Sequence, residues 1–369
     1  YLYLTRGYHS LHKLPYFANA FFGLSLSIFL YNVNQKYKFL VMDCISALKC
    51  FNRFMQQTIP LISVIIPTFN RFKMLERALR SVLTQSLQNF EVILIDDAST
   101  DGTDEYLQKR FSAEIEKGII LYTRNKNNKG RSVCRNIGIK LSNAEFIAFL
   151  DDDDEWLVDH LANLYNLLSK HKDLGIAFSN WYTVNEETKK ILPGIKGVST
   201  GTGNFYLGLM LRALIGYPST GMVRSSLIKK IGGFKEELIL REDWELFSKC
   251  ALASDIGFID KPTAYIYVHA GSYSKNKVQW VKDTELSWNS ILDFAKQHRV
   301  QIDNRFIAER SLRLSRGFLS VGDFDKAKAY LLNAIKYNPI SIFNSITMEN
   351  TFKLLIGKQF YLWYKSHKG

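Results

Sequence analysis

The sequence predicts an α/β fold in which a mainly parallel sheet is flanked by helices. Apolar runs of strand length alternate with helical patterns from residue 61 to residue 154, which is the order of β-α-β units. Two of these runs end directly in carboxylates, as strands do at the sheet edge where α/β proteins bind ligands. The 369 residues are 47% hydrophobic and 14% aromatic, which suffices for a sizeable core and argues against disorder.

The regular part of the chain predicts four strands separated by three helices. The strands are runs rich in Ile, Val, Leu and Phe, and lie at residues 61–66, 90–95, 119–122 and 146–150. The helices are expected at residues 71–86, 103–110 and 131–141. This half contains neither a GxGxxG motif nor a P-loop, so it lacks the usual phosphate-binding glycines of dinucleotide and ATP sites.

The second half has a less regular pattern. A helix is expected at residues 155–170 and a strand at residues 176–179. The Gly-rich residues 194–208 are expected to form a loop. Short helices are expected at residues 226–231 and 242–252.

Four consecutive carboxylates, Asp151 to Asp154, follow the fourth predicted strand. Adjacent carboxylates repel one another, and hard divalent ions such as Mg²⁺ or Mn²⁺ take oxygen ligands and share them with substrate phosphates. A solvated acidic loop is the alternative interpretation. Asp96 and Asp97 also follow a strand, so the two acidic groups are expected to converge on one sheet edge.

Four short strings in order resemble the inverting nucleotide-sugar glycosyltransferases of family 2, whose fold is called GT-A. They are residues 64–71 (VIIPTFNR), residues 95–103 (IDDASTDGT), residues 149–154 (FLDDDD), and GGF at 232–234 followed by REDW at 241–244. The resemblance covers roughly residues 61–275. It implies a GT-A fold and a glycosyltransferase activity.

The resemblance also implies a set of residues that bind the nucleotide-sugar. Asp97 would accept from the uracil N–H, which favours UDP as the carrier, although the string after it is also typical of a turn with a helix cap. For each Arg of the set, a surface helix charge is the alternative. The set is Pro67, Thr68, Asn70, Asp97, Gly130, Arg131, Arg135, Asp151 and Asp152.

The resemblance places Asp151 and Asp153 in an Asp-x-Asp motif that holds Mn²⁺ or Mg²⁺ on the donor phosphates. His269 is a candidate for a further metal ligand, and a structural histidine is the alternative. Asp154 is expected to orient its neighbours. The metal would neutralise the charge that develops on the leaving nucleoside diphosphate.

Asp243 is the candidate for the general base, and Glu242 is the alternative base. In an inverting displacement, a carboxylate takes the proton of the acceptor hydroxyl while its oxygen attacks the anomeric carbon. Two acids that merely start a helix, favoured by its dipole, are the structural alternative.

Three segments are expected along the chain, at residues 1–54, 55–298 and 299–369. The first is apolar and basic and too interrupted for a span of ~20 apolar residues; it is either a membrane anchor or sequence outside the native fold, because Met55 resembles a natural start. The second is the GT-A domain, with a nucleotide-binding half at 61–154 and an acceptor half at 155–298. The third is a helical extension with one tetratricopeptide-like helix pair and a basic amphipathic tail.

The formal charge of +13 is concentrated at the two ends of the chain. Residues 1–54 hold six basic and one acidic residue, and residues 301–369 hold eleven and five, so the body between them is nearly neutral. This distribution favours an anionic membrane surface over nucleic acid, and no nucleic-acid-binding motif accompanies it. The four cysteines show no CxxC spacing, which favours reduced thiols in the cytoplasm.

These observations predict a metal-dependent, inverting transfer from a UDP-sugar to a hydroxyl of a glycan or lipid-linked glycan, in bacterial cell-surface polysaccharide synthesis. The expected location is the cytoplasm, in peripheral contact with the inner membrane surface. The rival interpretations are a nucleotidyltransferase, which would normally have a Gly-rich phosphate loop, and a non-catalytic carbohydrate-binding protein.

Overall fold

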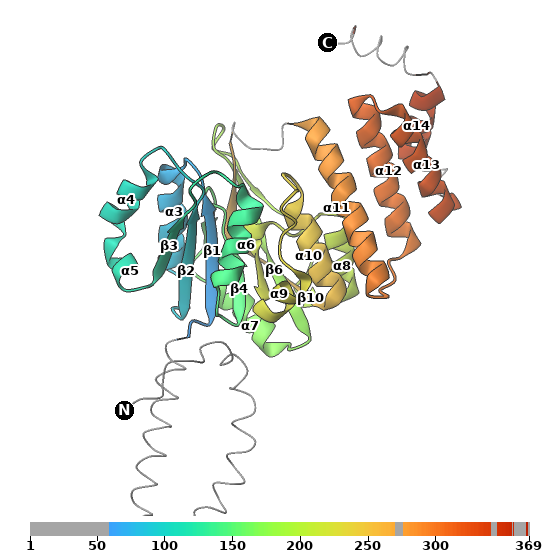
Figure 1. The fold of residues 1–369 in the computed structure, drawn as a ribbon. Helices are drawn as coiled ribbons and strands as arrows, with labels where there is room; N and C mark the ends of the chain where they lie inside the picture. The colour runs from blue at the N-terminus through green and yellow to red at the C-terminus, as the bar shows by residue number, and fades with distance from the viewer. Residues whose placement is uncertain (1–58, 270–275, 341–344, 356, 358–366, 368–369) are drawn as a thin grey trace, which may run out of the picture. The chain divides into compact units, whose positions relative to one another are not determined.

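A ten-stranded sheet organises the chain from residue 60 onward (Figure 1). The computed structural model describes residues 59–269, 276–340 and 345–355, together with Gly357 and His367. The chain divides into two compact units, residues 1–59 and 60–369, and all described helices and strands belong to the second. The predicted α/β fold with a mostly parallel sheet between helices is confirmed.

The first half of the sheet is parallel throughout. β1 (Ile62–Thr68) pairs with β2 (Phe90–Asp96) on one side and β4 (Phe146–Phe149) on the other, and β2 pairs with β3 (Ile120–Arg124). The register sets Thr68 beside Asp96, so β1 and β2 end together. The four predicted strands are confirmed to within two residues at each end.

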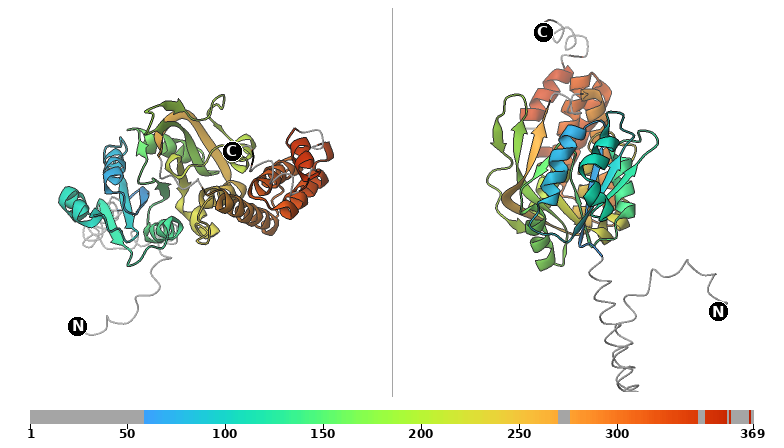
Figure 2. Two further views of the ribbon diagram at one scale, coloured as in Figure 1. Left: turned by 90° about the horizontal axis from the view of Figure 1, so that it is seen from above. Right: turned by 90° about the vertical axis from the view of Figure 1, so that its left-hand side faces the viewer.

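Helices cover both faces of this half, because the side chains of a strand alternate between faces. Ile62, Val64 and Ile66 pack in one cluster with α3 (Phe72–Leu83), whereas Ile65 packs in another with α6 (Arg131–Leu141). Figure 2 shows these two helices on opposite sides of the sheet. The other helices of this part are α4 (Thr103–Arg110), α5 (Ser112–Glu116) and α7 (His160–Lys170).

The second half of the sheet mixes directions. β9 (Gly221–Arg224) is antiparallel to both β4 and β6 (Leu174–Asn185), and β10 (Asp255–Val268) runs parallel to β6. β10 was not predicted, because Pro262 interrupts its pattern; the β6–β10 register shifts at that residue. Short strands complete the sheet at β5 (Glu155–Trp156), β7 (Ile191–Pro193) and β8 (Gly201–Thr202).

Two expectations for this half need correction. The helix predicted over residues 155–170 begins only at His160, because Glu155 and Trp156 pair with β10. The loop predicted over residues 194–208 contains β8 and the start of α8 (Asn204–Leu211), whose residues Tyr206, Leu209 and Met210 are buried in the core. The glycines on either side of this helix led to the prediction of a loop, because glycine is typical of turns and loops. The predicted strand at 176–179 and the two short helices are confirmed as parts of β6, α9 (Ser225–Ile231) and α10 (Glu242–Ala253).

In the part of the chain that the structure describes, four helices follow the sheet, and Figure 1 shows them in chain order beyond α10. α11 (Lys277–Gln297) packs on α10, with the rings of Trp288 and Trp244 stacked at 6.1 Å. The tetratricopeptide-like pair corresponds to α12 (Asn304–Val321) and α13 (Phe324–Tyr337), and α14 (Ser345–Leu355) follows.

Part of the predicted extension lies outside the described residues, including most of the amphipathic tail after Leu355. The segment 1–54 lies outside them as well. Within the described part of the chain, no helix is both long and apolar enough to cross a bilayer.

Candidate active site

Side chains from both halves of the sheet line a cavity of about 520 Å³, a volume in the range of ligand sites. Its walls include the loops after β1, β2 and β4 and the starts of α6 and α10. The predicted site residues that line it are Pro67, Thr68, Asp97, Gly130, Arg131, Arg135, Asp151, Asp152, Asp153, Glu242 and Asp243. Asn70 and His269 are not among its lining residues.

Asp151, Asp153 and Asp154 form a cluster that could hold a divalent cation. Each offers one carboxylate oxygen, and these oxygens lie within 4.8 Å of one another. Ser219 holds the cluster in place: its Oγ donates to Asp154 Oδ2 at 2.5 Å and accepts from the Asp151 amide at 3.1 Å. An oxygen-only set of this kind fits Mg²⁺ or Mn²⁺.

The predicted metal ligand His269 lies beside this cluster. Its Nε2 is 3.0 Å from Asp153 Oδ2, so the structure pairs the imidazole with a carboxylate of the run. Asp154, which was expected only to orient its neighbours, instead belongs to the group of converging oxygens.

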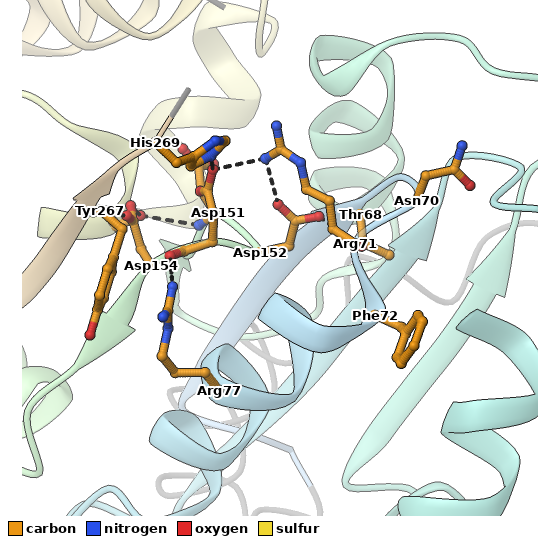
Figure 3. Close-up of polar contacts among 12 residues, drawn as sticks. Thr68, Asn70, Arg71, Phe72, Arg77, Asp151, Asp152, Asp154, Tyr267 and His269 are labelled. Atoms are coloured by element: carbon orange, nitrogen blue, oxygen red, sulfur yellow. Dashed lines mark hydrogen bonds and ion pairs between the residues drawn. The ribbon is translucent and has the colours of Figure 1, made fainter. Parts of the chain in front are cut away.

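Two arginines, Arg71 and Arg77, contact the acidic run, and Arg71 pairs with its carboxylates. Arg71 Nη1 lies 2.8 Å from Asp153 Oδ2 and 3.2 Å from Asp152 Oδ1. Arg77 Nη2 donates to the Asp153 carbonyl at 2.5 Å, and its guanidinium lies 3.5 Å from the centre of the Tyr267 ring. Figure 3 shows both arginines directed toward the acids.

Burial gives the carboxylates of the run different proton affinities. Burial, with the field of Asp153, raises the pKa of Asp152 to about 7, although its Oδ2 accepts from Thr68 Oγ1 at 2.8 Å. Burial also raises the pKa of Asp154 well above its usual value. Burial acts in the same sense on Asp151, but Arg135 and Arg131 outweigh it and hold the pKa of Asp151 below its usual value.

Arg135 connects the acidic run to the start of α10. It is almost fully buried, with Nη2 2.5 Å from Asp151 Oδ1 and Nη1 2.9 Å from Glu242 Oε1. Arg131 Nε lies 2.7 Å from the same Glu242 oxygen. These ion pairs occupy much of both guanidinium groups, so the predicted contact of Arg131 and Arg135 with the nucleotide stays a prediction.

The two candidate bases have different surroundings. Glu242 is 2% exposed, and its Oε1 is held by two arginines. Asp243 is partly exposed and lines the cavity. Because a general base must reach the hydroxyl that it deprotonates, this geometry favours Asp243.

Asp97 organises the loop that precedes α6. Its carboxylate accepts from the side chain of Asn125 at 2.8 Å and from the amides of Lys129 at 2.9 Å and Gly130 at 2.7 Å. Gly130 has φ = 87°, a conformation that favours glycine. The carboxylate therefore shapes one wall of the cavity as well as lining it.

Asn70 joins two loops and does not line the cavity. Its side-chain Oδ1 accepts from the backbone N–H of Thr100 at 2.7 Å, and its backbone N–H donates to Ser99 Oγ at 2.9 Å. In Figure 3 its side chain points away from the acids. The structure thus gives Asn70 a local structural role, and its contact with a nucleotide stays a prediction.

The sequence patterns assigned no role to five residues at the site: Arg71, Arg77, Ser219, Arg241 and Trp280. Arg71 is the last residue of the first family-like string, so the sequence could have indicated that it belongs to the site. Ser219 and Trp280 belong to no motif and reach the site only through the tertiary fold.

Known proteins resemble this chain in sequence and in fold. Residues 63–232 match the family Glycosyl transferase family 2. An uncharacterized glycosyltransferase of Rickettsia conorii is 31% identical over 57% of this chain, which spans only 33% of that relative. The Escherichia coli protein named UDP-Glc:alpha-D-GlcNAc-diphosphoundecaprenol beta-1,3-glucosyltransferase WfaP is 30% identical over 59% of this chain and 81% of its own length.

Among solved structures, S. aureus TarS 1–349 in complex with UDP-GlcNAc has a TM-score of 0.63 at 21% identity. The match covers 83% of this chain and 92% of TarS 1–349, which supports the predicted GT-A fold. With the family match and the similarity to WfaP, the chain belongs to glycosyltransferase family 2.

Proposed function

We propose that the protein transfers a sugar from a UDP-sugar to a hydroxyl of a glycan or lipid-linked glycan, with inversion and with the help of a divalent metal. One observation carries the proposal: the cluster of converging carboxylates and the accessible Asp243 line one cavity. A metal-bound diphosphate and a base for the acceptor hydroxyl are the two groups that such a displacement needs.

The donor would occupy the side of the cavity formed by the loops after β1 and β2, near Thr68, Asp97 and Gly130. Mn²⁺ or Mg²⁺ would be held by Asp151, Asp153 and Asp154, and when bound it neutralises charge on the leaving diphosphate. Arg71 and His269 both contact Asp153 and would keep its carboxylate oriented. The names of WfaP and of the TarS complex, which include UDP-Glc and UDP-GlcNAc, support UDP as the carrier.

Asp243 would take the proton of the acceptor hydroxyl. The acceptor oxygen forms its bond to the anomeric carbon on the face opposite the diphosphate, whose bond to that carbon breaks, and the product is UDP. The proton remains on the Asp243 carboxylate until solvent removes it. Glu242, paired with Arg131 and Arg135, would hold the first turn of α10 and hence the base in position.

The proposed acceptor class and cellular role are inferred from the names of similar proteins. Proteins named for colanic acid and teichuronic acid biosynthesis are 42% and 39% identical to parts of this chain, and WfaP is named for a lipid-diphosphate acceptor. We place the protein in polysaccharide synthesis on the cytoplasmic face of the membrane. Its basic chain ends support attraction to anionic lipids.

A panel of nucleotide-sugars tests the proposal, with release of UDP measured in Mn²⁺ and again in EDTA. We expect one UDP-sugar to give metal-dependent release that Asp153→Ala abolishes, while Asp159→Ala, a charge-matched change outside the cavity, leaves it intact. Release of pyrophosphate instead of UDP would favour a nucleotidyltransferase. Calorimetric binding of the donor without turnover, even with glycan acceptors added, would favour a non-catalytic binder.

A further inference from the structure

Arg241 lies two residues before Asp243 and lines the same cavity. Its guanidinium is 5.0 Å from the centre of the Trp244 ring and 5.0 Å from the centre of the Trp280 ring. Within the described part of the chain, the Arg241 side chain makes no hydrogen bond and no ion pair, and its Nε is buried without a partner. An unpaired guanidinium beside a catalytic carboxylate requires an explanation, because buried charges are normally paired.

Other arginines of the cavity are already engaged. Arg71 is paired with Asp152 and Asp153, and Arg135 with Asp151 and Glu242. Arg241 therefore differs from both in keeping its donors available. Its terminal nitrogens are the donors that remain accessible, since only Nε is enclosed.

The two indoles hold the guanidinium in place without using its hydrogen-bond donors. Cation–π contacts engage the flat faces of the guanidinium or its carbon, whereas its N–H groups lie in the plane. Burial lowers the pKa of Arg241 against the field of Asp243, yet an arginine keeps its proton at neutral pH. A fixed planar fork of free N–H groups is suited to binding a phosphate or carboxylate through two hydrogen bonds.

Of the two indoles that contact Arg241, Trp244 belongs to the buried core. Trp244 is 3% exposed and its Nε1 donates to the Met210 carbonyl at 2.9 Å. The guanidinium of Arg310, from α12, lies 4.3 Å from the centre of the Trp244 ring. Trp280 is the exposed member of the group, 37% accessible in the first turn of α11. The C-terminal helices thus contribute directly to the environment of Arg241.

We propose that Arg241, held by Trp244 and Trp280, binds a phosphate oxyanion of the acceptor close to its reactive hydroxyl. The proposal deepens the function given above and rests on it in one respect, the assignment of the Asp243 side of the cavity to the acceptor. The acceptor class is then a sugar carried on a phosphate or diphosphate, as in a lipid-linked intermediate. A neutral glycan would leave the Arg241 fork unpaired.

Octyl diphosphate, a diphosphate monoester without a sugar, is the probe for this site. The full-length protein is saturated with UDP and Mn²⁺ to fill the donor side and is then titrated with the probe by calorimetry. We expect saturable binding by the unmodified protein and a Kd raised about tenfold or more in Arg241→Gln, since charged hydrogen bonds are lost. Arg241→Lys should fall between the two, because it keeps the charge but loses the planar fork.

Two further variants separate the aromatic support from general damage. Trp280→Ala should weaken binding of octyl diphosphate, and Trp280→Phe should restore much of it. Arg305→Gln removes the same charge at an exposed position whose partner is Asp303, and should leave the Kd unchanged. Octyl glucoside, which has the same tail without a phosphate, should not bind.

Equal affinity of Arg241→Gln and the unmodified protein for octyl diphosphate would overturn the proposal. So would no binding to the UDP-loaded protein, or a raised Kd for UDP in Arg241→Gln, which would assign the arginine to the donor. Absence of UDP binding to the unmodified protein is a different result, because it contradicts the proposed function. The titration without UDP then still decides whether Arg241 binds a diphosphate.

Discussion

Arg135 donates to Glu242 at 2.9 Å, and both side chains are almost fully buried. The same guanidinium reaches Asp151 of the acidic run at 2.5 Å, so one side chain joins the two regions that the proposed reaction needs. Burial lowers the pKa of Arg135, but Asp151 and Glu242 outweigh it and hold that pKa above its usual value. The arginine is therefore a fixed positive charge between the metal cluster and the start of α10.

Replacing Arg135 with Met should destabilise the protein strongly. The change leaves Glu242 and Asp151 without their buried cation, and breaking such a pair costs about 3–5 kcal/mol. Urea unfolding measures the loss. The control is Arg110→Met, whose ion pair with Glu76 is surface-exposed and should contribute less than about 1 kcal/mol.

A double variant, Arg135→Met with Glu242→Gln, distinguishes a lost ion pair from simple loss of packing. Removing the carboxylate charge should recover part of the stability, giving a coupling energy of about 1 kcal/mol or more. Additive losses in the two single variants would show that the pair has no energetic coupling, and would contradict its role as the link between the two regions.

The two adjacent acids of α10 should give opposite phenotypes. Asp243→Asn should lower kcat by about 10²- to 10⁴-fold, because it removes the proton acceptor, while the Kd for UDP and the thermal midpoint stay unchanged. Glu242→Gln should lower the thermal midpoint, because it removes a charge held by Arg131 and Arg135. Turnover in Asp243→Asn close to that of the unmodified protein would eliminate Asp243 as the base.

The first half of the site could be predicted from sequence because its parts are local. β1, β2 and β4 each show an apolar run followed by polar residues, and parallel pairing brings those ends together. The pairing of Arg135 with Glu242 could not be predicted, since the residues are 107 positions apart and each fits a solvated helix end equally well. Tertiary packing alone buries them.

The second half was harder to predict because its strands do not follow the simple pattern. β10 carries Asp260, Lys261 and Pro262 in its middle, where the register with β6 shifts, and such residues normally end a strand. Trp280 lines the cavity and Ser219 bonds to Asp151 and Asp154, and both belong to segments that have no motif. Only their contacts in the folded structure indicate a chemical role for these two residues.

Ser219 should control metal affinity although it is not a carboxylate. It fixes Asp154 through its hydroxyl and receives the amide of Asp151, so Ser219→Ala loosens two members of the cluster at once. Loss of such a supporting contact typically costs about 10- to 100-fold in metal affinity, and we expect the Mn²⁺ concentration for half-maximal UDP release to rise accordingly. The matched change Ser86→Ala removes a surface hydrogen bond to Asp159 and should leave that concentration unaltered. Equal Mn²⁺ dependence in both variants would contradict the support role.

His160 should make the stability of the fold sensitive to acid. It is fully buried, its Nδ1 lies 2.7 Å from Thr263 Oγ1, and its ring stacks on Trp156 at 4.3 Å. Thr263 donates its own proton to Ser179, so Nδ1 carries the hydrogen of this contact. Burial lowers the pKa of His160 from 6.5 to about 3 and outweighs the contact with Thr263, which acts in the opposite direction.

The sign of the pH effect follows from this depressed pKa. The unfolded chain takes up a proton near pH 6.5 and the folded chain does not, so the contribution of His160 to stability is complete above that pH. It falls as the pH drops toward 3, by about 1.4 kcal/mol per pH unit. His160→Gln should lower the free energy of unfolding at pH 7 but reduce its slope with pH between about 6 and 4. His171→Gln, at the partly exposed end of α7, provides the control for loss of a histidine. A slope in His160→Gln as steep as in the unmodified protein would mean that other groups cause the acid sensitivity.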